Sequence, residues 1–161
     1  MNRRFIDQVS LFDGVADVLR GMVPVELGEL RCPAHRYGIK SWFGGDKPAR
    51  EHYEAQVIAP RYVPDASVVA VEIGFHAEHP RLADNEAVLA RLLAAERKWR
   101  RRLGREAEGG PFLGPADGWR RLSETWADPD LSSPDLPFEV AARLTDYITL
   151  LEPFRRAVSA P

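Results

Sequence analysis

Residues 51–58 read EHYEAQVI, and residues 68–79 read VVAVEIGFHAEH. β-branched and aromatic residues dominate both stretches and prolines lie near their ends, which predicts two β-strands. The connection between them is too short for a parallel crossover, so we expect the strands to pair antiparallel. Residues 68–71 are apolar on both faces, which predicts a central position for the second strand. These two stretches therefore place an antiparallel sheet at the centre of the fold.

The flanking segments predict helices around that sheet. Apolar residues at helical spacing, with glycine or a polar residue at the ends, indicate the helices. We expect an α+β domain over residues 1–161, with an antiparallel meander of four to six strands packed with two or three helices. The predicted elements are a helix at 3–21, a strand meander at 25–78, a helix at 85–103, short strands at 110–126 and a helix at 138–157.

Composition excludes several classes of protein. The net charge of −2 gives no bulk attraction to nucleic acid or to anionic membranes. Cys32 is the only cysteine, so an intrachain disulfide and a cysteine-based zinc site are both excluded. We see neither an apolar core of signal-peptide length nor a run of the roughly 20 apolar residues needed to span a membrane. We therefore expect a cytoplasmic protein without a membrane partner, and the strong preference for arginine over lysine suggests a bacterial source.

One face of the predicted hairpin gathers four ionisable side chains. Side chains alternate between the two faces of a strand, so His52 and Glu54 share one side of the first strand, and Glu72 and His76 share one side of the second. A turn centred near Val63 would place Glu54 opposite Glu72, with the histidines at diagonal positions. A shifted register would instead pair His52 with His76. The candidate metal or polar site consists of these four residues in either register.

Two opposed carboxylates repel each other unless a cation or a proton lies between them. The cation could be a divalent metal, because imidazole and carboxylate suit zinc, manganese and iron(II). It could equally be Lys40 or an arginine from a neighbouring strand. The alternatives are a solvated sheet face with ordinary ion pairs and a binding pocket without chemistry. No other cofactor is indicated.

The end of the second strand, His76-Ala77-Glu78-His79, resembles a cluster of metal ligands. It is not a His-Glu-x-x-His motif, and on a strand His76 and His79 point to opposite faces. They would converge only if the chain turned at His79-Pro80. We therefore interpret this stretch as a polar strand end that caps the next helix.

A basic segment lies at the end of the helix predicted for 85–103. Positive charge at a helix C-terminus can bind phosphates, but it also suits the negative end of the helix dipole. Trp99 lies on the apolar stripe of that helix and is expected in the core rather than stacked on a base. The candidate phosphate-binding residues are Arg97, Lys98, Arg100, Arg101, Arg102 and Arg105.

The order of elements over residues 36–158 resembles that of uncharacterised bacterial domains that are sometimes fused to nuclease or restriction proteins. No motif carries this resemblance, so it implies no functional residue. A nuclease core would place a lysine two residues after the strand carboxylate, whereas Gly74 follows Glu72 at that spacing. We assign no family from it.

Three functional hypotheses follow. Because we find no complete catalytic signature, the leading one is a non-catalytic binding or accessory domain for a protein or small-molecule partner. The alternative is a metal-assisted hydrolase that uses the His/Glu patch. The third is nucleic-acid binding through the basic helix end. A homodimer through an exposed edge strand or the closing helix is also compatible with the pattern.

Overall fold

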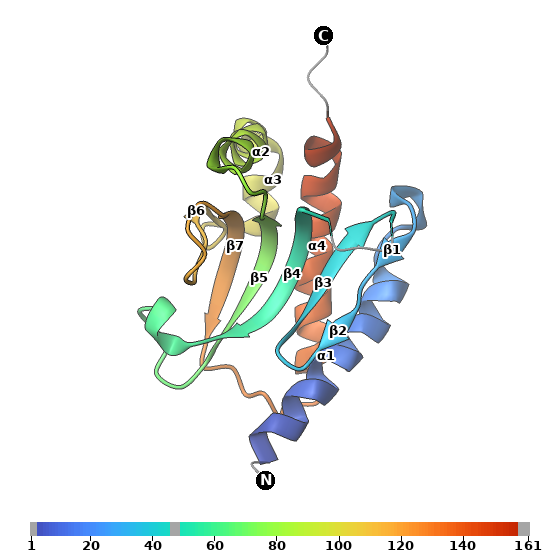
Figure 1. Ribbon diagram of the computed structural model, residues 1–161. Helices are drawn as coiled ribbons and strands as arrows, with labels where there is room; N and C mark the ends of the chain where they lie inside the picture. Colours follow the sequence, from blue (N-terminus) through green and yellow to red (C-terminus); the bar gives the residue numbers. More distant parts are fainter. Residues whose placement is uncertain (1–2, 46–48, 158–161) are drawn as a thin grey trace.

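The computed structural model describes residues 3–45 and 49–157, with the side chains of residues 3–10 left aside. Within these residues it has four α-helices and a seven-stranded antiparallel sheet (Figure 1), which confirms the predicted α+β class. The helices are α1 (Arg3–Met22), α2 (Leu82–Ala94), α3 (Glu96–Leu103) and α4 (Leu136–Arg156). The strands are β1 (Leu30–Arg31), β2 (Ala34–His35), β3 (Gly38–Phe43), β4 (Glu51–Ile58), β5 (Ala70–Ala77), β6 (Glu108–Pro111) and β7 (Arg120–Ala127).

The strands follow the order β1-β3-β4-β5-β7-β6, and β2 also pairs with β3. The predicted meander holds as far as β5, after which α2 and α3 intervene and β7 returns to pair with β5. β5 is therefore central, and all eight of its residues are buried. This agrees with the prediction from its apolar start.

Helices cover one face of the sheet. α1 and α4 pack against each other behind β3, β4 and β5, while α2 and α3 lie against α4 beside the upper part of the sheet (Figure 1). The main core lies between these layers, and alternate residues of the central strands such as Tyr53 and Phe75 point into it. Burying a large apolar side chain of this kind contributes about 1.5–3 kcal/mol. The remaining residues of β4, β5 and β7 point to the opposite face, where the polar side chains lie.

Two predicted features differ from the structure. The helix expected over 85–103 is two helices, α2 and α3, which meet at Ala95. Two-residue strands β1 and β2 extend the sheet at its β3 side. The predicted numbers of helices and strands were therefore too low for the described part of the chain. None of the described helices is long and apolar enough to cross a membrane.

A buried carboxylate ties the end of α4 to β4. Glu152 is fully buried and accepts hydrogen bonds from the Tyr53 hydroxyl at 2.9 Å, from Arg155 at 2.6 Å and from Arg156 at 2.8 Å. Burial alone would raise the pKa of Glu152, but its hydrogen bonds with the two arginines outweigh burial and lower it. The ionised carboxylate therefore stabilises the fold.

We expect Glu152→Gln to lower the free energy of unfolding at pH 7 by about 1–3 kcal/mol, because two guanidinium groups lose a charged partner. The folded pKa lies below the ordinary value of 4.5. The contribution is therefore complete above that value and disappears as the pH falls through the folded pKa. Urea titrations from pH 7 to pH 3 should show the difference between wild type and variant shrinking on acidification. A difference independent of pH would contradict this assignment.

Candidate metal centre

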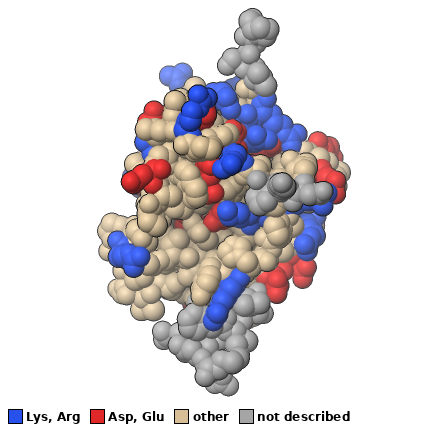
Figure 2. All heavy atoms as spheres, viewed as in Figure 1, with Lys and Arg blue, Asp and Glu red and all other residues tan. Residues whose placement is uncertain are grey.

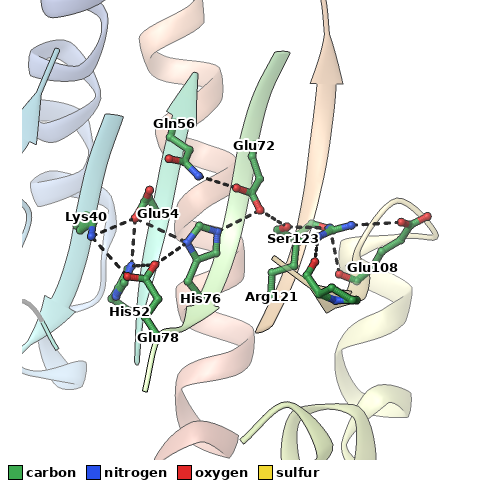
Figure 3. A network of polar contacts seen from close by, with 11 residues as sticks. Lys40, His52, Glu54, Gln56, Glu72, His76, Glu78, Glu108, Arg121 and Ser123 are labelled. Carbon is green, nitrogen blue, oxygen red and sulfur yellow. Dashed lines mark hydrogen bonds and ion pairs between the residues drawn. The ribbon is translucent and has the colours of Figure 1, made fainter. Parts of the chain in front are cut away.

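Four donor side chains converge on the face of the sheet opposite the helices (Figure 3). His52 and Glu54 come from β4, His76 comes from β5, and Glu78 follows the end of β5. Each offers one donor atom, and these atoms all lie within 4.8 Å of one another. The register that pairs His52 with His76 brings the two imidazoles together, and the backbone N–H of Glu78 continues the pairing by donating to Arg50.

The spacing of the donor atoms fits a coordination polyhedron. His52 Nε2 lies 3.1 Å from Glu54 Oε1 and 3.3 Å from Glu78 Oε2. His76 Nδ1 lies 3.7 Å and 3.4 Å from the same two carboxylate oxygens. Ligand atoms of a tetrahedral site with bonds of about 2.0–2.1 Å lie about 3.3 Å apart. These four distances between donor atoms are therefore close to the distances between ligand atoms in a metal-bound tetrahedral site.

Both imidazole rings are oriented by a second contact. His52 Nδ1 lies 2.9 Å from the carbonyl oxygen of Ala49, and His76 Nε2 lies 3.1 Å from Glu72 Oε2. When each of these nitrogens donates its proton outward, the other ring nitrogen is left with a lone pair directed into the cluster. Backbone carbonyls and carboxylates orient metal-binding histidines in this way.

The inward nitrogen of His76 has no good hydrogen bond. His76 is fully buried, and its Nδ1 finds no hydrogen-bond partner of acceptable geometry in the described part of the chain. Buried polar atoms are rarely left in this state without a structural or functional reason. This nitrogen is therefore a second observation, independent of the clustered carboxylates, that indicates a ligand.

A further layer of contacts holds the site in place. Gln56 donates to Glu72 Oε1 at 2.9 Å, and the Ser123 hydroxyl donates to Glu72 Oε2 at 2.7 Å (Figure 3). The ring of Phe112 packs edge-on against His76, with the ring centroids 5.2 Å apart. The β7 side of the cluster is therefore supported by buried, hydrogen-bonded side chains.

The histidines and carboxylates of the cluster shift one another's pKa values. Burial alone would lower the pKa of His52 and His76, but contacts with the neighbouring carboxylates outweigh it, so the pKa of His52 is raised and that of His76 is raised strongly. Burial acts in the opposite sense on Glu54, where contacts with the two imidazoles lower the pKa to about 2.

Burial alone would also raise the pKa values of Glu72 and Glu78. Contacts with His76, Ser123 and Gln56 lower the pKa of Glu72, and contacts with both imidazoles lower that of Glu78. These pKa shifts favour the charged forms of all five groups, in which two imidazolium groups and Lys40 would balance the charges of the three carboxylates. A divalent metal that replaces the two imidazolium protons leaves this balance unchanged.

Three of the four predicted site residues, His52, Glu54 and His76, lie together in the cluster, and the fourth, Glu72, lies outside it. Glu72 does not face the centre of the cluster but supports His76 from behind. Glu54 lies opposite Gly74 rather than Glu72, so the register centred near Val63 is wrong and the register that pairs the two histidines is the observed one.

Sequence reasoning missed Glu78 as a member of the site, although the alternation of side chains along a strand already places Glu78 on the face of His76. His79 points elsewhere and pairs with Glu51 at 2.7 Å. The Asn85 side chain accepts the N–H of His79 and donates to its carbonyl, which joins the strand end to α2. The first residue of α2 has no side-chain cap, so the capping role predicted for this stretch is not observed.

The basic segment lies apart from this cluster, on α3 and the turn that follows. Trp99 is fully buried and donates to the carbonyl of Leu92, so its predicted core position is confirmed. Arg100 binds Glu96 and the carbonyls of Gly104 and Ala107. Arg100, one of the six candidate phosphate-binding residues, is thus engaged in contacts within the protein, which makes the segment less suited to phosphate binding.

No protein-family model, curated protein or solved structure matches this chain. We therefore infer the function from the geometry of the site. Two imidazole nitrogens and two carboxylate oxygens form a donor set that suits zinc, manganese or iron(II), and contains no thiolate that would favour copper(I).

Proposed function

We propose that this protein binds one divalent transition-metal ion through His52, Glu54, His76 and Glu78. The supporting observation is that two imidazoles and two carboxylates converge at tetrahedral spacing, and that the second ring nitrogen of each imidazole contacts an acceptor outside the cluster. Zinc fits this spacing and donor set best. Manganese and iron(II) would need additional ligands from water or a small molecule.

Burial distinguishes this proposal from ordinary ion pairing. His52 and His76 are at most 1% exposed, and Glu54 is 4% exposed. Ion pairs buried to this degree contribute little net stability, because desolvation offsets most of their attraction. Groups whose pKa values are strongly shifted by burial and by charged partners occur preferentially at functional sites. A bound metal ion would explain why five ionisable groups are kept together in one small buried space.

The proposal unites two of the hypotheses drawn from the sequence. A metal-binding domain needs no chemistry of its own, so it can serve as a non-catalytic binding or accessory protein. A metal-assisted hydrolase is the second candidate, favoured by the position of Lys40 at the outer edge of the site, 3.7 Å from Glu78. The metal would supply a nucleophilic water there. Hydrolysis of activated esters by metal-loaded protein, lost in His76→Ala, would favour this second candidate.

We further infer that the protein works in the bacterial cytoplasm. The arginine-rich composition and the absence of any possible intrachain disulfide support this setting.

Metal binding is tested on protein purified without an affinity tag. We expect about one equivalent of metal by elemental analysis, or stoichiometric uptake of added Zn²⁺ by calorimetry after chelation. The variant His52→Ala/His76→Ala should lose it, because it removes both nitrogen ligands. His35→Ala is the matched control, since His35 is exposed and lies on β2. Failure of the wild type to bind zinc, manganese, iron(II) or cobalt(II) would refute the proposal.

A further inference from the structure

The side chains of the site become more exposed in one direction. Exposed fractions are 0% for His76 and 1% for His52, rise to 11% for Glu78 and reach 33% for Lys40. The outer end of the site is therefore formed by Glu78 and Lys40. In Figure 2, which views this face of the sheet, acidic and basic atoms lie side by side near its middle, among largely uncharged surface.

Glu78 differs from the other three ligand residues in its place in the fold. Glu54 lies within β4, which has β3 on one side and β5 on the other, and His52 and His76 are anchored by outward hydrogen bonds. Glu78 lies beyond the end of β5, and the ion pairs that its carboxylate makes within residues 3–45 and 49–157 are with His52, His76 and Lys40. Turning this side chain toward solvent gives up these ion pairs and no other hydrogen bond or ion pair among the described residues.

We infer that the Glu78 carboxylate is an exchangeable ligand, and that the carboxylate of a small-molecule ligand takes its coordination position beside Lys40. This inference rests on the proposed metal site. His52, Glu54 and His76 remain as the permanent ligands. Two imidazoles and one carboxylate form a ligand set that leaves positions open to small molecules in other metal proteins.

Charge favours a carboxylate over other ligands at this position. The metal and Lys40 together carry three positive charges, and Glu54, Glu72 and Glu78 carry three negative ones. When Glu78 turns outward, a bound monocarboxylate restores the balance within the buried space. A neutral ligand would leave one excess positive charge there, which is costly in a poorly hydrated site. Lys40 contributes a hydrogen bond to the second oxygen of the bound carboxylate.

The test uses cobalt(II) as the metal, because its visible spectrum reports the ligands around it, and acetate as the probe. We expect Glu78→Ala to bind cobalt(II) at least about 10-fold more weakly than wild type. Acetate at about 100 mM should restore the affinity to within about threefold of wild type. Sodium chloride at equal ionic strength should not. Restoration should be lost in Glu78→Ala/Lys40→Met and absent from Glu54→Ala, in which a buried, permanent ligand is missing.

Wild-type protein provides a measurement that does not depend on the folding of any variant. Acetate should change the visible spectrum of the wild-type cobalt(II) protein in a saturable manner. An unchanged spectrum, restoration by chloride, or equal restoration of Glu54→Ala would overturn this inference and leave the metal site standing. Absence of cobalt(II) binding by the wild type would instead overturn the proposed function itself.

Discussion

Replacing Gly74 by alanine is expected to lower the free energy of unfolding by about 3 kcal/mol or more, through overpacking and backbone strain together. Gly74 lies in the middle of β5 with a φ of 155°. A Cβ at this position would lie 2.5 Å from the carbonyl oxygen of Leu122 and 2.5 Å from the Cα of Ser123, closer than such atoms approach. Both of these atoms belong to the backbone of β7, so no side-chain rotation can relieve the contact.

For a protein of this size, such a loss corresponds to a fall in Tm of about 6–12 °C. Gly110→Ala is the matched control, because Gly110 lies on β6, on the far side of β7, and its Cβ would meet no atom within 4 Å. We expect the control to change stability by less than about 1 kcal/mol. Equal melting temperatures for the two variants would show that β5 and β7 are not as close as the structure places them.

The same substitution should also disturb the metal site. Gly74 lies between Glu72 and His76 along β5 and pairs with Ser123, which donates to Glu72. Pushing β7 away from β5 separates this donor from its carboxylate. If the variant still folds, its metal affinity should therefore fall together with its stability.

The faces of the central strands could be predicted from the sequence, but their register could not. A period of two places His52, Glu54, Glu72 and His76 on one side whatever the pairing. The register depends on how the connecting segment is accommodated, and here it contains the 3-10 helix Pro60–Tyr62. The two registers considered were distinguishable only by that connection, which has no regular turn signature.

The supporting layer of the site depends on contacts between distant parts of the chain. Ser123 reaches Glu72 only because β7 pairs with β5, across the intervening helices α2 and α3. Such pairing leaves no local pattern in the sequence. Glu78 is the opposite case, because simple alternation from His76 would have found it.

The break between α2 and α3 shows that one side-chain hydrogen bond can end a helix even where the helical spacing of apolar residues continues. The carbonyl of Leu92 accepts the N–H of Ala95 at 3.1 Å and the indole N–H of Trp99 at 2.8 Å. The tight turn and the captured carbonyl end the first helix at Ala94. The spacing of apolar residues indicates which side is buried, but it does not show where a tryptophan will bond to the backbone.

Glu72→Gln is expected to weaken metal binding about 10- to 100-fold, although Glu72 does not touch the metal. Glu72 Oε2 accepts the Nε2 proton of His76, which leaves Nδ1 free to bind metal. A glutamine amide that faces His76 would donate instead, and the ring would then carry its proton on Nδ1. The opposite orientation of the amide would set its NH₂ against the donating amide of Gln56. Either arrangement raises the free energy of the metal-binding tautomer.

This positioning role has a spectroscopic signature that loss of packing alone would not produce. In zinc-loaded wild type, two-bond ¹H–¹⁵N spectra should show His76 protonated at Nε2, and in zinc-loaded Glu72→Gln that proton signal should shift or be lost. Glu108→Gln is the matched control, because its carboxylate is exposed on β6, two strands away from Glu72, and pairs only with Arg121 among the residues described. Its cobalt(II) affinity should equal that of wild type within about twofold, a difference of about 0.4 kcal/mol. A Glu72→Gln variant that binds cobalt(II) as tightly as this control would show that Glu72 does not orient the ligand.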